Sequence, residues 1–146
     1  LAAQPALREA IIDGCPLLTD VTALIRIRGL ADLALRHLPT LDAGALSAIL
    51  DAHPELRVLD CEGCQAITDL GFLAGHGLVS LNILGTAISD LAPLHAQQEL
   101  RVLRFDPATA RSGWSQVQGL VKLRYISSGR NLQDAQEFWA ALTQGP

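Results

Sequence analysis

Leucines recur along the chain at a regular spacing and predict a series of short, similar segments. Within each segment the fourth and sixth residues are apolar, and alternation with a period of two places both side chains on one face of a short strand. Because one such strand cannot cover its own apolar face, we expect the strands to stack side by side around a shared core. The six segments, 20 to 26 residues apart, begin at Leu7, Leu30, Leu56, Leu78, Leu100 and Leu120. The fourth residues are Ala10, Leu33, Leu59, Leu81, Leu103 and Leu123, and the sixth are Ile12, Leu35, Cys61, Ile83, Phe105 and Tyr125.

The stretches between the predicted strands carry turn and helix signals. Three of them place Asp after Ser or Thr, a pair that begins tight turns and short helices, so we assign these carboxylates to capping rather than catalysis. Residues 40–54 form a longer stretch with Leu46, Ile49 and Leu50 at helical spacing, which predicts an α-helix ending before Pro54. A C-terminal cap helix is predicted over residues 131–143, with Asn131 as its N-cap. The three capping residues are Asp20, Asp69 and Asp90.

These positions together form the pattern LxxLxLxx(N/C/T)xL, which resembles the leucine-rich repeat family from Leu7 to Tyr125. The stretches with Ser or Thr before Asp are similar to the short, internalin-like bacterial subclass. The resemblance implies a single α/β domain over residues 1–146, built as a right-handed leucine-rich-repeat solenoid. It implies a parallel sheet of short strands on the concave face, with mixed turns and short helices on the convex face and a C-terminal capping helix. Residues 1–6 are too short to cap the N-terminal end, where we expect a missing upstream segment or a partner.

Composition limits the classes of function. The 146 residues are 49% hydrophobic and 18% charged, which favours one folded domain with a sizeable core. The formal charge of -4 gives no overall basic field, so we expect no nucleic-acid partner. Apolar runs stop well short of the roughly 20 residues of a membrane helix. Three cysteines do not form a disulfide framework and favour the cytoplasm, although a secreted or delivered effector stays open.

A CxxC pair, Cys61 and Cys64, raises the question of thiol chemistry. The two residues occupy the sixth and ninth positions of the third segment, which face the interior, so the repeat itself imposes their spacing. We expect buried structural thiols there, and also at Cys15, the ninth residue of the first segment. A redox pair or a metal site stays open as an alternative, although no second CxxC or HxxxH supplies further zinc ligands. We expect His53 and His76 to lie in solvated loops.

Function is expected on the concave face, formed by the third, fifth and seventh residues of each segment. Acidic residues occupy this face in the first three segments, and basic residues in the last two. We therefore predict a non-enzymatic module that binds another protein, with no catalytic residue, cofactor or metal. Alternatives are a solvated face without a partner, a structural or oligomerisation scaffold using the N-terminal end, and a thiol redox protein using Cys61 and Cys64. The predicted partner-binding residues are Val58, Asp60, Glu62, Asn82, Leu84, Val102, Arg104, Lys122, Arg124 and Ile126.

Overall fold

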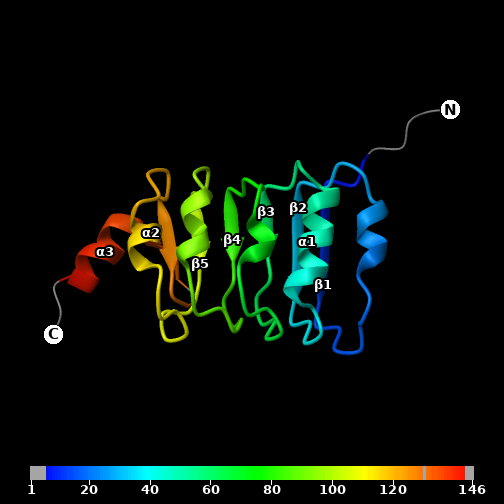
Figure 1. Cartoon of the computed structure of the whole chain (residues 1–146), viewed down its shortest axis with the longest axis horizontal. Helices are drawn as coiled ribbons and strands as arrows, with labels where there is room; N and C mark the ends of the chain where they lie inside the picture. Colours follow the sequence, from blue (N-terminus) through cyan, green and yellow to red (C-terminus); the bar gives the residue numbers. More distant parts are fainter. Residues whose placement is uncertain (1–5, 130, 144–146) are drawn as a thin grey trace.

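A seven-stranded sheet runs along the length of the molecule, with its strands side by side in the order of the chain (Figure 1). The computed structural model describes residues 6–129 and 131–143. Strands β1 to β6 are parallel to their neighbours, and β7 is antiparallel to β6. The protein therefore has an α/β fold with a mostly parallel sheet of short strands. The strands are β1 (Glu9–Asp13), β2 (Asp32–Arg36), β3 (Val58–Asp60), β4 (Ser80–Asn82), β5 (Val102–Arg104), β6 (Tyr125–Ser127) and β7 (Gln133–Asp134).

Strand register follows the leucine pattern through the first five segments. Their fourth residues lie directly opposite one another across the sheet, in the order Ala10, Leu33, Leu59, Leu81 and Leu103. The four leucines are each at most 1% exposed. The expected alternation is confirmed in these strands, because apolar side chains at one position line the core while the residues beside them face the other way.

The predicted register of the sixth segment is wrong by three residues. Leu103 pairs with Ile126, not with Leu123. The Arg124 amide donates to the carbonyl of Arg101, as the Arg101 amide does to Val79, so Arg124 precedes its strand just as Arg101 does. Leu120, Leu123 and Ile126 recur every three residues, so the same pattern fits two starting points, and the structure takes the later one at Leu123.

Helical segments form a second layer that covers one face of the sheet (Figure 1). The first five members along the chain contact one another in a row, whereas the C-terminal helix contacts the last two strands. Among the described residues, no helix combines the length and apolar character needed to cross a bilayer. The members are the 3-10 helices η1 (Thr22–Arg26), η2 (Gly71–Leu73) and η3 (Ala92–Ala96), and the α-helices α1 (Ala43–Ala52), α2 (Trp114–Gln118) and α3 (Ala135–Thr143).

Aspartates lie just before four of the helical segments and bond to their first backbone amides. Asp20, Asp69 and Asp90 each accept a hydrogen bond from the backbone amide two residues later, at 2.8, 2.8 and 3.0 Å. Asp42 accepts from the Ala45 amide at 2.8 Å and caps α1, whose buried face is Leu46, Ile49 and Leu50 as predicted. The capping role of these aspartates is confirmed, and their carboxylates are occupied by local backbone donors.

The C-terminal end of the core is closed by an aromatic cluster. Phe105 and Trp114 meet Phe138 and Trp139 of α3 edge to face, with ring centroids 5.1 to 6.2 Å apart. The helix begins at Ala135, later than predicted, because residues 133 and 134 pair with β6 as a strand. Its cap is Asp134, which accepts from the amides of Gln136 and Glu137, so the prediction that Asn131 caps the helix is wrong.

The N-terminal end of the sheet is less covered. Ala10 and Ile12 of β1 are only partly buried, although their counterparts in the next strand are fully buried. Leu7, Ile11 and Leu17 are 52%, 59% and 92% exposed. Among the described residues β1 pairs only with β2, so one edge of this strand offers free backbone groups.

Candidate functional site

The face of the sheet opposite the helical layer is the candidate site, and we refer to it as the open face. Two rows of side chains cross it at the spacing of the strands, about 4.8 Å. Seven of the ten predicted residues lie at the expected positions on or beside these rows: Val58, Asp60, Glu62, Asn82, Leu84, Val102 and Arg104. One row consists of Val58, Ser80, Val102 and Tyr125, and the other of Asp60, Asn82, Arg104 and Ser127.

Hydrogen bonds hold the polar side chains of the open face in place. Arg36 donates from Nε to Asp60 Oδ2 at 2.8 Å and also forms an ion pair with that oxygen at 2.7 Å. Asn82 donates to Glu62 at 3.1 Å, and the Asn82 side-chain oxygen accepts from the amide of Leu84. These side chains are thus ordered before any partner arrives, which lowers the entropy lost on binding.

Arg104 contributes the remaining positive charge of this part of the open face. No ion-pair partner of Arg104 is present among residues 6–129 and 131–143, whereas Arg36 is paired with Asp60. Its guanidinium is partly exposed and can donate to a carboxylate of a bound protein.

Two adjoining hollows lie on the open face around the Arg36–Asp60 pair. The larger has a volume of about 360 Å³, and Arg104, Asn82 and Glu62 are among its lining residues. The smaller, of about 140 Å³, lies towards β1 and is lined by Ile11, Ala34 and other residues. The face therefore combines apolar contacts near β1 with paired charges and a free arginine near β5, a composition that suits a protein surface.

Three predicted site residues do not lie in these rows. Ile126 is 0% exposed and points into the core, because it occupies the position expected for Leu123. Arg124 precedes β6 at the edge of the sheet. Lys122 forms an ion pair with Glu99. The predicted separation of charge along the open face is therefore wrong, since Arg104 is the one remaining member of its basic group on this face.

Tyr125 is the residue that the sequence reasoning missed. It lies beside Val102 in the register of the sheet and is 48% exposed. The apolar residues at 120, 123 and 126 could have placed it. A segment that starts at Leu123 instead of Leu120 makes Tyr125 its third residue, which faces the open side of the sheet. An exposed aromatic side chain beside valines is a common anchor at interfaces, and the prediction that Tyr125, as a sixth residue, faces the core is corrected.

The CxxC cysteines lie inside the protein. Cys61 and Cys64 are both 0% exposed, and the Cys64 thiol donates to the carbonyl of Leu35 at 3.0 Å. Burial raises the pKa of both thiols above the ordinary value of 9.0, which leaves no reactive thiolate near neutral pH. The prediction of buried thiols is confirmed for this pair. It is wrong for Cys15, which is exposed because no further strand of the described chain covers the first segment.

Among the described residues, the histidines do not combine with other ligands into a metal site. His53 is 3% exposed, and its Nε2 lies 2.8 Å from the carbonyl of Leu24, so the expectation of a solvated loop is wrong for this residue. The side chain of His76 is largely buried, at 13% exposed, and its Nε2 lies 3.1 Å from Asp51 Oδ1. Within the part of the chain that the structure describes, no group of three or more His, Cys, Asp or Glu residues could hold a metal ion.

Comparison with known proteins adds no relative, since no protein-family model and no curated protein matches the chain. The class of protein is thus defined by the fold, which is α/β with a seven-stranded, mostly parallel sheet.

Proposed function

We propose that this chain is a right-handed leucine-rich-repeat solenoid that binds another protein through the open face of its sheet. In this proposal the open face is the concave face, and binding occurs by surface complementarity without catalysis, cofactor or metal. The leucine pattern and the in-register strands support the family assignment. Fold alone does not fix function, so the interaction role depends on the site itself.

One observation carries the proposal: the row Val58, Ser80, Val102 and Tyr125 lies beside a row in which Arg104 has no ion-pair partner among the described residues. Apolar and aromatic contact area next to a free arginine is the composition of interface hot spots. The hydrogen bonds of Asp60, Glu62 and Asn82 fix the surrounding polar groups, which favours a specific partner. We place this interaction in the cytoplasm on the basis of cysteine usage, with a secreted or delivered effector as the alternative.

The test is affinity capture with the intact chain and two variants. The variant Tyr125→Ala/Arg104→Glu alters the open face, and the control variant Arg26→Glu/Arg111→Glu alters exposed arginines elsewhere on the chain. Proteins captured from the native lysate are quantified by mass spectrometry. The proposal predicts a protein that the open-face variant loses at least about tenfold while the control variant retains it. It is rejected if every captured protein is retained by the open-face variant.

A second candidate role, a scaffold that assembles through the N-terminal end, is favoured by the exposed edge of β1. Ile11 is 59% exposed there, and the strand has one free side in the described chain. Two copies that paired antiparallel about Ile11 would place Glu9 against Asp13 of the other copy, which is unfavourable. We therefore expect a different protein or segment at this edge. Sedimentation velocity distinguishes the cases, because concentration-dependent association that Ile11→Lys abolishes would support self-assembly.

The redox alternative has no observation in its favour. Cys61 and Cys64 are inaccessible, and neither lies at the N-terminus of a helix, where a thiolate would be stabilised.

A further inference from the structure

One edge of the sheet, at the start of its strands, carries exposed basic residues that the open face does not use. Backbone hydrogen bonds place four residues side by side at the starts of neighbouring strands. The Val79 amide donates to the Arg57 carbonyl, the Arg101 amide to the Val79 carbonyl and the Arg124 amide to the Arg101 carbonyl, at 2.7 to 2.9 Å. Three of the four are arginines, and all three are exposed. Together with Lys122, which is also exposed, we name Arg57, Arg101 and Arg124 the basic edge.

The guanidiniums of the basic edge are largely free for a ligand. Arg57 bonds only to backbone carbonyls, those of Pro54, Leu56 and Gly77, at 3.3 to 3.4 Å. Lys122 is neutralised by Glu99, and the pKa of Glu99 is lowered chiefly by that hydrogen bond, with smaller contributions from Arg101 and Arg57. The side chains of Lys122, Arg101 and Arg57 therefore all lie near one carboxylate, that of Glu99.

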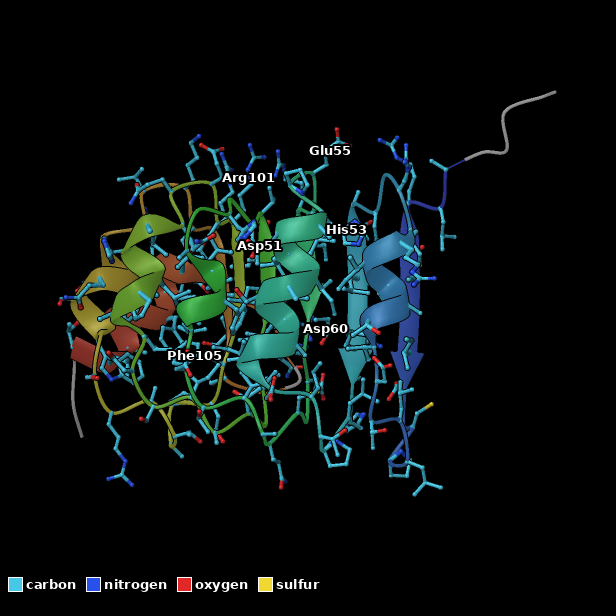
Figure 2. All side chains as sticks on the ribbon, turned by 45° about the vertical axis from the view of Figure 1, so that its right-hand side comes forward. Asp51, His53, Glu55, Asp60, Arg101 and Phe105 are labelled. Carbon is cyan, nitrogen blue, oxygen red and sulfur yellow. The ribbon has the colours of Figure 1, made fainter. Side chains whose placement is uncertain are left out.

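The opposite edge of the sheet carries more acidic than basic residues, although Arg36 and Arg104 end β2 and β5 there. Asp13 and Asp60 end β1 and β3, and Glu62 and Asp106 follow the ends of β3 and β5. Figure 2 shows Arg101 and Glu55 at one edge, away from Asp60. A chain of net charge -4 thus carries four exposed basic residues together at one edge, which creates a local positive field.

A hollow next to Arg57, with a lining more polar than apolar, adds a small apolar contact. It has a volume of about 470 Å³ and is lined by Pro54, Arg57, Gly75, Gly77, Val79 and Glu99. The two glycines keep it open, since a Cβ built at either position would meet nothing within 4 Å. Pro54 and Val79 supply apolar surface, so a side chain such as leucine can enter beside the arginines.

We propose that the basic edge binds a short acidic segment of a partner protein, with carboxylates on Arg101 and Arg124 and an apolar residue in the hollow. The span from Arg57 to Arg124 covers three strand spacings, about 14 Å, which matches about four residues of extended chain. Arginine pairs with carboxylates in two-pronged geometry, which favours acidic side chains over other acceptors. A long nucleic acid fits less well, because Glu55 and Glu99 interrupt the edge and the rest of the chain would repel it.

The experiment uses fluorescence anisotropy with a labelled peptide of glutamates around one central leucine. Measurements are made on the whole chain at about 50 mM salt, where surface charges are weakly screened. The edge variant Arg101→Glu/Arg124→Glu is compared with Arg26→Glu/Arg111→Glu, which changes the net charge equally at exposed sites outside both the basic edge and the open face. We expect the dissociation constant to rise at least about tenfold in the edge variant and by less than about threefold in the control. Circular dichroism checks folding, and Arg101→Gln/Arg124→Gln replaces the edge variant if it is unfolded.

Two further binding measurements test the role of the leucine and compare the peptide with a nucleic acid. Gly77→Leu is expected to weaken the leucine peptide severalfold and to leave a peptide with alanine at that position unchanged. A single-stranded oligonucleotide of equal charge is expected to bind more weakly than the peptide. The proposal is overturned if the native protein does not bind the peptide, if both double variants lose it equally, or if the oligonucleotide binds more tightly. None of these outcomes depends on the open face, so the two proposals fail separately.

Discussion

The guanidinium of Arg36 lies on one carboxylate oxygen of Asp60, with its Nε at 2.8 Å and a terminal nitrogen at 2.7 Å. The contact joins the end of β2 to the end of β3 and forms the wall between the two hollows of the open face. The hydrogen bond with Asp60 raises the pKa of Arg36, so this side chain stays charged at all relevant pH values. Water reaches the pair, since the side chains are 37% and 16% exposed.

A double-mutant cycle on this pair is expected to give a coupling free energy of about 0.5 to 1 kcal/mol, because solvent screens a partly exposed ion pair. The variants are Arg36→Gln, Asp60→Asn and the double change. Asn retains an acceptor for the Glu62 amide, which bonds to Asp60 at 3.1 Å, so the cycle isolates the charge. Urea unfolding measures the free energies. A coupling free energy of zero, or one that does not change with salt concentration, would contradict an electrostatic contribution.

Thiol labelling is expected to separate Cys15 from the other cysteines. The native protein should react with one equivalent of a small thiol reagent near pH 8, because Cys15 alone is exposed. Cys61 and Cys64 should react only after unfolding, since they are buried and burial raises the pKa of each thiol. Mass spectrometry counts the labels, and Cys15→Ser serves as the unlabelled native control. Rapid double labelling of that variant would revive the redox alternative.

Alkaline pH is expected to destabilise the fold through the same two thiols. The unfolded chain loses these protons near the ordinary pKa of 9.0, whereas the folded chain retains them to higher pH. Their contribution to stability is therefore fully present below pH 9 and is lost as pH rises towards the folded values. The free energy of unfolding should fall by up to about 1.4 kcal/mol per pH unit for each thiol. Urea unfolding between pH 8 and 10 should show a shallower decline for Cys61→Ala/Cys64→Ala than for the native chain.

Hydrophobic spacing was enough to predict the first five strands, their parallel order and their registers. Each of these elements depends on a local rule, in which the fourth residue faces the core and a capping aspartate begins the return segment. The sixth register failed because residues 120, 123 and 126 satisfy that rule twice. The decision came from long-range packing, since α3 and β7 dock on β6 and fix which residues of β6 face inward.

The site was less predictable because it depends on whether a residue precedes its strand or lies on it. Arg101 and Arg124 precede their strands by one residue and lie at the basic edge. Arg104 ends its strand and lies on the open face. A shift of three residues moved Arg124 from the open face to the basic edge. The burial of His53 likewise depends on the carbonyl of Leu24, 29 residues away, which no local pattern indicates.

Gln97 is expected to contribute more stability than its polar side chain suggests. It is 1% exposed, its oxygen accepts from the amide of Leu78 at 3.1 Å, and its nitrogen donates to the carbonyl of Leu73 at 3.1 Å. Gln97→Met keeps the volume but leaves the Leu78 amide without its acceptor, whereas the Leu73 carbonyl still accepts from the His76 amide. The expected cost is about 1 to 3 kcal/mol. Gln118→Met, at an exposed position of α2, should change stability by less than about 0.5 kcal/mol. Equal midpoints in urea for the two variants would show that water replaces the side chain.

Gly113 is the position where an added methyl group is expected to be most damaging. Its φ is +86°, and a Cβ there would lie 2.2 Å from the backbone nitrogen of Ala92 and 2.4 Å from the carbonyl carbon of Leu91. These are backbone atoms at the start of η3, so relief requires α2 and η3 to move apart.

We therefore expect Gly113→Ala to cost at least about 3 kcal/mol, combining left-handed strain with the backbone clash. Gly77→Ala is the matched control, because it has open space around its Cβ and no positive φ, and it should lie within about 1 kcal/mol of the native chain. Thermal and urea unfolding of both variants, followed by circular dichroism, measure the difference. A Gly113→Ala protein as stable as Gly77→Ala would mean that α2 does not pack against η3 as closely as described.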